Sequence, residues 1–216
     1  QNLPEPLRSQ LLYGDWKKGL QDAANQTIPT EWVRAAQKRW REDPPVGIPM
    51  CAIGVDASGG GPDPMVQAVR HDGWFGPLIK TEGKLIPRTQ AGSFAAGLVI
   101  ANRRDKATVV VDMGGGYGGP MYEHLIANEI DAVAYKGAEG TTKRTKDGKL
   151  GFTNVRSAAY WGMREALDPD QPGGSPIALP PDARLLAGLT APTYTVTPRG
   201  IQVEPKTARE GGKKGV

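Results

Sequence analysis

The sequence has few of the residues on which several common kinds of site depend. It has one cysteine, so it forms no internal disulfide, and a reducing compartment suits it better than a secreted, disulfide-held scaffold. Its two histidines, His71 and His124, lie far from any nucleophile motif, which argues against a hydrolase triad. The lack of clustered Cys and His likewise argues against a zinc site.

Several longer motifs are also missing. No apolar run approaches the ~20 residues that a membrane-spanning helix needs, and no signal-peptide pattern is visible, so we expect neither membrane insertion nor secretion. The GxxxxGK[ST] phosphate-binding loop does not occur, so the chain should not bind ATP by that route. The glycine run at 114–119 resembles part of a dinucleotide-binding motif, but Tyr117 would crowd a pyrophosphate there. No acidic residue ends a following strand at the expected place, which argues against a dinucleotide site.

The sequence is rich in glycine and proline and has an excess of basic over acidic residues. The 29 glycines and 19 prolines lie between apolar runs without a period, which excludes a collagen-like repeat. Hydrophobic residues make up 38% of the 216 residues, enough to build a core and to argue against disorder. The net charge of +4 favours a polyanionic partner.

The first 45 residues differ from the rest of the chain. They contain helix-like stretches at 6–12 and 31–41, and Thr30 is the expected N-cap of the second stretch. Asp43-Pro44-Pro45 then ends that helix, because proline disfavours helical geometry in the residue before it. We therefore expect a boundary there, with a helical linker region at 1–45 and a second region at 46–216.

The second region alternates between strand and helix patterns. The expected strands cover 51–56, 65–70, 74–80, 107–112 and 131–135, with a hairpin turn at 71–73. The expected helices cover 89–101, a segment starting at Pro120, 154–167 with Asn154 as N-cap, and 181–189. A final hairpin is expected over 194–197 and 201–204. This order predicts an α/β fold with a mixed central sheet flanked by helices and an added C-terminal β-hairpin.

Two acidic residues are the strongest candidates for a site. Asp56 and Asp112 each end an apolar strand, and each is followed by a glycine-rich turn. Ligands of open α/β sheets bind at the carboxyl ends of strands, and hard cations such as Mg²⁺ or Mn²⁺ prefer carboxylate oxygens. The alternative is that each carboxylate only caps its own turn.

Two basic segments are candidates for contact with nucleic acid. The segment 136–149 and the segment from Arg199 onwards each carry a local charge of +3. Lys and Arg grip phosphate backbones, although most charge runs are solvated surface. The candidate DNA-binding residues are Lys143, Arg144, Lys146, Lys206 and Arg209.

Taken in order, several segments resemble the nuclease domain of a tailed-bacteriophage terminase large subunit. Leu12-Tyr13-Gly14-Asp15-Trp16 is similar to the region that joins the motor domain to the nuclease. The strands and turns around Asp56 and Asp112 are similar to the two acidic motifs of that family. The helix at 154–167 and the stretch from Ile177 to Lys206 are similar to the segments that follow. The resemblance covers nearly the whole chain.

The resemblance implies an RNase H-like fold and a divalent-metal-dependent endonuclease that cuts concatemeric double-stranded viral DNA during genome packaging. It implies a two-metal site for Mg²⁺ or Mn²⁺, in which Asp56 bridges both ions, Asp112 holds one, and Asp63 is a tentative further ligand. A third acid on a helix is expected beyond Val216, so the nuclease region would be truncated. Residues 1–45 would be the linker from an ATPase domain that this sequence does not include.

The same resemblance implies partners and a location. The partners are double-stranded DNA, the portal protein and the small terminase subunit, with no membrane partner and a monomeric isolated domain. The location is the host cytoplasm, at the procapsid portal. The alternatives are another RNase H-like nuclease, such as a Holliday-junction resolvase or integrase, and a non-catalytic DNA-binding module whose acidic pair is structural.

Overall fold

The computed structural model describes residues 22–204. The helix expected at 6–12, the segment from Leu12 to Trp16, and the candidate DNA-binding residues Lys206 and Arg209 lie outside these described residues. No helix among residues 22–204 is long and apolar enough to cross a membrane.

A six-stranded mixed sheet forms the centre of the fold. Its strands are β1 (Ala52–Asp56), β2 (Met65–His71), β3 (Trp74–Phe75), β4 (Ile79–Thr81), β5 (Thr108–Asp112) and β6 (Ala132–Tyr135). They lie in the order β3-β2-β1-β5-β6, and β4 also pairs with β2. β1 pairs with β2 antiparallel and with β5 parallel, and β5 pairs with β6 parallel. The expected mixed α/β sheet is confirmed.

One predicted strand is wrong in its extent. The segment 74–80 forms two short strands, β3 and β4, both of which pair with β2. Gly76 lies between them, and its N–H donates to the Val69 carbonyl at 3.0 Å. Pro77 has no N–H to give to the sheet, so the pairing stops and resumes at Ile79.

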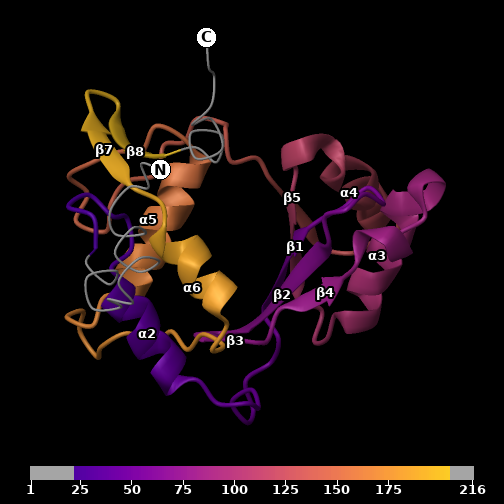
Figure 1. The fold of residues 1–216 in the computed structure, drawn as a ribbon, viewed down its shortest axis with the longest axis horizontal. Coiled ribbons are helices and arrows are strands. Elements are labelled where there is room, and N and C mark those ends of the chain that lie inside the picture. The colour runs from indigo at the N-terminus through magenta and orange to yellow at the C-terminus, as the bar shows by residue number, and fades with distance from the viewer. Residues whose placement is uncertain (1–21, 205–216) are drawn as a thin grey trace, which may run out of the picture.

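Two helices cover one face of the sheet, α3 (Ala91–Asn102) and α4 (Gly118–Ala127) (Figure 1). Each connects two parallel strands or leads into one, and each packs its small and apolar side on the strands. Alternate residues of β1 and β5 point toward these helices. The buried core between sheet and helices includes Ile53, Val55, Val109, Val111, Met121 and Leu125.

The remaining helices form a second body on the other side of the sheet, at the left of Figure 1. They are α2 (Thr30–Arg39), α5 (Val155–Leu167) and α6 (Ala183–Thr190). Their buried core includes Val33, Ala36, Leu167 and Leu179. Helix α2 therefore packs on helices from the C-terminal half, while the predicted boundary near residue 45 stays a prediction.

The two bodies meet at β3. The Phe75 N–H donates to the Ala178 carbonyl at 2.9 Å, and the Ala178 N–H donates to the Gly73 carbonyl at 2.9 Å. Trp40, directly after α2, stacks on Trp74 with ring centroids 6.2 Å apart. These contacts hold the second body at one edge of the sheet.

The helix ends show which capping predictions hold. Asn154 caps α5, because its side chain accepts from the Ser157 N–H at 2.8 Å, as expected. Thr30 is not an N-cap: it is the first residue of α2, and its N–H donates to the Asp22 carboxylate at 2.9 Å. Short 3₁₀ helices complete the described helices, at Gly83–Leu85, Arg88–Gln90 and Gly114–Gly116.

The predicted C-terminal hairpin is present as β7 (Tyr194–Thr197) and β8 (Gly200–Val203). It packs beside α5 through a small core that contains Phe152, Ala158 and Ile201. Gly200 has a φ of 112°, and a Cβ there would lie 2.3 Å from the Gly151 carbonyl oxygen. Only glycine fits this turn.

Candidate metal centre and nucleic-acid interface

The register of β1 and β5 brings the two acidic residues together. Val55 pairs with Val111 in the parallel ladder, so the next residues, Asp56 and Asp112, lie side by side at the carboxyl edge. Neighbouring strands are about 4.8 Å apart, which is close for two carboxylates. The sequence-predicted convergence of this pair is therefore present in the structure.

Both acids point away from the helices α3 and α4. Val55 and Val111 are buried under those helices, and successive side chains of a strand alternate between faces. Asp56 and Asp112 therefore lie on the opposite face, where Asp56 is exposed and Asp112 is half-buried. The Asp112 Oδ1 accepts a hydrogen bond from the Gly114 N–H at 2.9 Å, which holds its carboxylate at the edge.

A shallow depression of about 400 Å³ lies in front of the pair. Its floor is made of small or apolar side chains of three neighbouring strands, and its polar side chains are the two acids and one tyrosine. The lining residues are Gly54, Val55, Asp56, Val66, Ala68, Val110, Asp112 and Tyr135. The depression is open to solvent and has its polar groups at one end, as a site for an extended ligand would.

Tyr135 is the residue of this site that sequence reasoning missed. It ends β6 and pairs with Asp112 in the parallel ladder, so it is the third strand end at this edge. Burial raises the pKa of the Tyr135 phenol, the guanidinium of Arg156 lowers it, and the charge of Asp112 raises it, with a net upward shift. The phenol therefore stays protonated at neutral pH and can donate a hydrogen bond. The available signal was its position as the last residue of a predicted parallel strand.

Asp63, the tentative third ligand, lies in the loop between β1 and β2 and is exposed. Its carbonyl accepts from the Ser58 hydroxyl at 2.6 Å. No group of three or more His, Cys, Asp or Glu side chains within residues 22–204 is placed to hold a metal ion. The assignment of Asp63 as a further ligand therefore stays a prediction.

The glycine-rich turns after the two acidic strands contact each other. A Cβ on Gly59 would lie 1.9 Å from the Tyr117 ring, so the ring rests directly on the Gly59 backbone. A Cβ on Gly118 would lie 2.2 Å from the Asp112 carbonyl oxygen. Small residues are needed here for the close packing of two loops, which fixes the positions of both strand ends.

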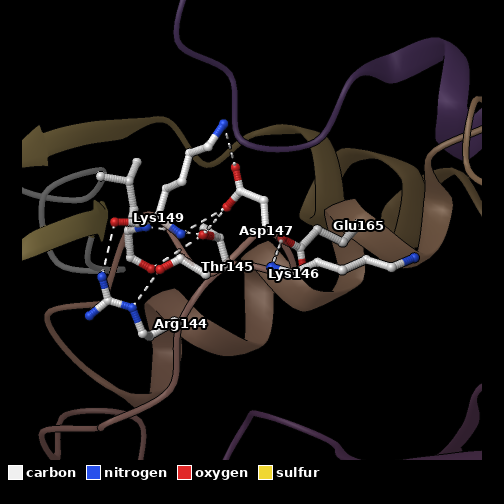
Figure 2. Close-up of polar contacts among 8 residues, drawn as sticks. Arg144, Thr145, Lys146, Asp147, Lys149 and Glu165 are labelled. Carbon is white, nitrogen blue, oxygen red and sulfur yellow. Dashed lines mark hydrogen bonds and ion pairs between the residues drawn. The ribbon is translucent and has the colours of Figure 1, made fainter.

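The predicted basic loop lies beside α5, and many of its polar groups are hydrogen-bonded to other residues of the same loop (Figure 2). The Arg144 guanidinium donates to the Gly148 and Lys149 carbonyls at 2.7 and 3.0 Å. The backbone N–H of Lys146 donates to the Glu165 carboxylate at 2.8 Å. Lys143, Arg144 and Lys146 are all exposed, and the Arg144 guanidinium closes the loop through its two hydrogen bonds.

The centre of the same loop is a hydrogen-bonded turn around Asp147. Its carboxylate accepts from the Thr145 hydroxyl at 2.6 Å and from the Lys149 N–H at 3.1 Å. The Thr145 hydrogen bond is the main reason why the pKa of Asp147 is lowered, with help from the Lys149 N–H. The loop therefore has a defined shape that depends on its charged residues.

Comparison by sequence finds no matching family model and no matching curated protein. Comparison by structure finds the nuclease domain of the large terminase subunit gp2 of bacterial virus Sf6, with a TM-score of 0.62 and 20% identity over 87% of this chain and 91% of that chain. A mutant of that domain with manganese and beta-thujaplicinol gives a TM-score of 0.61 and 19% identity, over 86% of this chain and 90% of that chain.

A further mutant of the Sf6 domain, with calcium, gives a TM-score of 0.60 and 19% identity over 87% of this chain and 91% of that chain. These superpositions cover most of the chain. At this level of identity they establish the fold. The chain therefore has the RNase H-like fold of the nuclease domains of phage large terminase subunits.

Proposed function

We propose that this chain is a divalent-metal-dependent endonuclease that cuts double-stranded DNA. The observation that carries the proposal is the parallel register that sets Asp56 beside Asp112 on the face of the RNase H-like sheet opposite α3 and α4. Two carboxylates so close repel each other unless a cation lies between them. The likeness of the fold to a phage terminase nuclease supports the choice of DNA as substrate.

The donor set suits Mg²⁺ or Mn²⁺. Carboxylate oxygens are hard ligands, and an exposed site leaves room for the waters that Mg²⁺ retains. Asp56 and Asp112 would hold the metal, and Asp63 stays the tentative additional ligand. Two such ions, when bound, would supply the chemistry of activating water and stabilising charge on the attacking and leaving oxygens of a phosphodiester. Manganese and calcium accompany the similar Sf6 domain.

The other side chains at the edge have supporting roles. The Tyr135 phenol lines the depression, where its O–H would donate a hydrogen bond to a phosphate oxygen. The apolar floor at Gly54, Ala68 and Val110 limits water on one side of the bound strand. Lys143 and Lys146 add contacts to the DNA backbone, while Arg144 keeps their loop in shape. Lys206 and Arg209 would extend the same basic contact.

The biological setting follows the resemblance. In that setting, the nuclease would cut concatemeric viral DNA into genome lengths. It would act together with the portal protein and the small terminase subunit, in the host cytoplasm at the procapsid portal. The region before residue 45 would join an ATPase domain.

The proposal is tested by nicking of supercoiled plasmid DNA in Mg²⁺, in Mn²⁺ and in EDTA. We expect cleavage only with metal, and its loss in Asp56→Asn and in Asp112→Asn. Asp170→Asn is the matched control, because Asp170 is an exposed acid in the loop after α5. Metal-independent cleavage, or equal activity of all three variants, would contradict the assignment.

The same assay separates the alternatives. A resolvase would prefer four-way junctions over plain duplex, and an integrase would join strands as well as cut them. A non-catalytic module would bind DNA without cutting it, and its melting temperature would not respond to Mn²⁺.

A further inference from the structure

A second groove, of about 420 Å³, lies on the helix side of the sheet, between the start of α3 and the start of α4. Arg88, Ser93, Tyr117 and His124 are among its lining residues, and no Asp or Glu lines it. Gly92 of α3 lets the two helices approach here, because a Cβ on it would lie 2.6 Å from Pro120. We call this the Arg88 groove.

The Arg88 groove is joined to the acid pair by short pieces of backbone. The Arg88 Nε donates to the Gly60 carbonyl at 3.2 Å, in the turn that follows Asp56. The Tyr117 ring rests on Gly59 of that turn and itself belongs to the turn that follows Asp112. The groove and the acid pair therefore share the carboxyl edge of β1 and β5 and are held in a set relation to each other.

Several hydrogen-bond donors that line the groove have no acceptor among residues 22–204. Apart from its Nε bond, Arg88 makes no hydrogen bond or ion pair with any residue between 22 and 204, and neither does the His124 ring or the Tyr117 hydroxyl. Elsewhere in the described chain, Lys80 pairs with Asp182 at 3.4 Å. Lys84 likewise pairs with Glu82 at 2.6 Å. Hydrogen-bond donors gathered in one groove that no carboxylate lines fit an anionic ligand.

We propose that the Arg88 groove binds a phosphate of the DNA backbone other than the one that is cut. This proposal rests on the proposed nuclease function and adds a second anchoring point for its substrate. A guanidinium matches two phosphate oxygens at once, and an imidazole N–H and a phenol O–H add single bonds. Each DNA strand carries a phosphate about every 3.4 Å along the helix axis, so a duplex at the acid pair presents further phosphates to the same edge.

The first test measures duplex DNA binding without divalent metal, over a series of salt concentrations. We expect Arg88→Gln to weaken binding about tenfold, equally for duplexes of different sequence, and to lower the slope of log K against log salt by about 0.9. Arg104→Gln is the matched control, because Arg104 is an exposed arginine just past the other end of α3 and bonds only to nearby carbonyls. It should bind DNA like the wild type.

A second variant separates binding from loop structure, since Arg88 also holds the Gly60 turn. His124→Ala removes a lining side chain from the surface of α4 without touching that turn, and it should weaken binding as well. Phosphate ethylation should interfere with wild-type binding at one phosphate beside the cut position, and this interference should vanish in Arg88→Gln.

The outcomes distinguish this proposal from the nuclease assignment. If Arg88→Gln and His124→Ala both bind duplex with the wild-type affinity and salt slope, or if Arg104→Gln loses as much, the groove does not bind phosphate. If the wild type never cuts DNA but Arg88→Gln and His124→Ala still weaken binding selectively, the nuclease assignment fails and the phosphate site remains.

Discussion

The acid pair at the carboxyl edge and the basic loop at 143–150 are both charged surface regions, but their charges make different contacts. Asp56 and Asp112 carry like charges side by side, on a sheet face that α3 and α4 leave uncovered. In the loop, Arg144 is hydrogen-bonded to two carbonyls and Asp147 to Thr145 and Lys149. The first arrangement sets two like charges side by side, whereas in the second each of these charged groups is hydrogen-bonded within the loop.

Charges that serve function and charges that serve structure can be distinguished by what surrounds them. Like charges held close together cost stability and persist only where another task requires them. Opposite charges and carbonyls in mutual contact stabilise a local shape. Substitutions at the edge should therefore remove activity and keep stability, while substitutions of Arg144 should do the reverse.

The largest expected effect is that of Asp56→Ala on DNA cleavage. Loss of one of the two carboxylates removes metal binding, so nicking of supercoiled plasmid in Mn²⁺ should fall by a factor on the order of 10³ or more. Without metal, the melting temperature should stay the same or rise, because the repulsion between Asp56 and Asp112 is relieved. A variant that melts well below the wild type would show that the acid pair stabilises the fold, as the charges of the basic loop do.

The next effect is that of Tyr135→Phe, which removes one hydroxyl from the same edge. The phenol is a neutral donor beside the acid pair, so its loss should slow single-turnover cleavage on the order of tenfold and leave duplex affinity nearly unchanged. Tyr194→Phe is a suitable control, because Tyr194 lies in the C-terminal hairpin and packs edge-on against Trp161, with ring centroids 5.0 Å apart. If both variants slow cleavage equally, Tyr135 has no specific role at the site.

Much of the edge could be predicted from the sequence. Apolar runs that stop at an acid predicted β1 and β5, and the parallel ladder between them then placed Asp56 beside Asp112. Tyr135 was missed because a tyrosine at a strand end carries no charge signal, and its closeness to Asp112 depends on the β5–β6 register. The register between strands that are distant in the sequence cannot be predicted from a local sequence pattern.

The loop could be predicted only as a basic segment. Net charge does not reveal that the Arg144 guanidinium turns back onto its own carbonyls or that the Lys146 N–H meets Glu165, 19 residues later in the chain. The Arg88 groove escaped notice for the related reason that its residues come from separate segments, none of which is strongly basic. The break of the third predicted strand at Gly76-Pro77, in contrast, follows from proline chemistry that is local to the sequence.

A smaller effect separates the members of the basic loop. Lys143→Gln combined with Lys146→Gln should weaken duplex binding about threefold and lower the salt slope, because both lysines are exposed and available to phosphates. Arg144→Ala should instead lower the free energy of unfolding by about 1 kcal/mol, because it removes hydrogen bonds that close the loop. Chemical denaturation and a binding titration on each variant check this division. If Arg144→Ala unfolds like the wild type but loses DNA, the loop is a binding surface throughout.

The smallest expected effect concerns Asp182, which provides a reference for a purely structural carboxylate. It caps α6 by accepting from the Arg184 and Leu185 N–H groups at 2.7 and 2.9 Å, and these bonds, that to Leu185 foremost, lower its pKa below the usual range. Asp182→Ala should cost about 1 kcal/mol of unfolding free energy.

Asp182→Asn keeps the capping geometry and isolates the charge of that carboxylate. A lowered pKa in the folded state means that the charge stabilises the fold above the unfolded pKa, near 3.9, and that this contribution disappears as the pH falls through the folded value. The wild type should therefore exceed Asp182→Asn by about 0.5 kcal/mol at pH 7 and match it at the acid end of a titration. Urea denaturation at a series of pH values measures the difference. A constant gap at every pH would mean that Asn caps the helix poorly, so that the stabilisation comes from cap geometry and charge has no part in it.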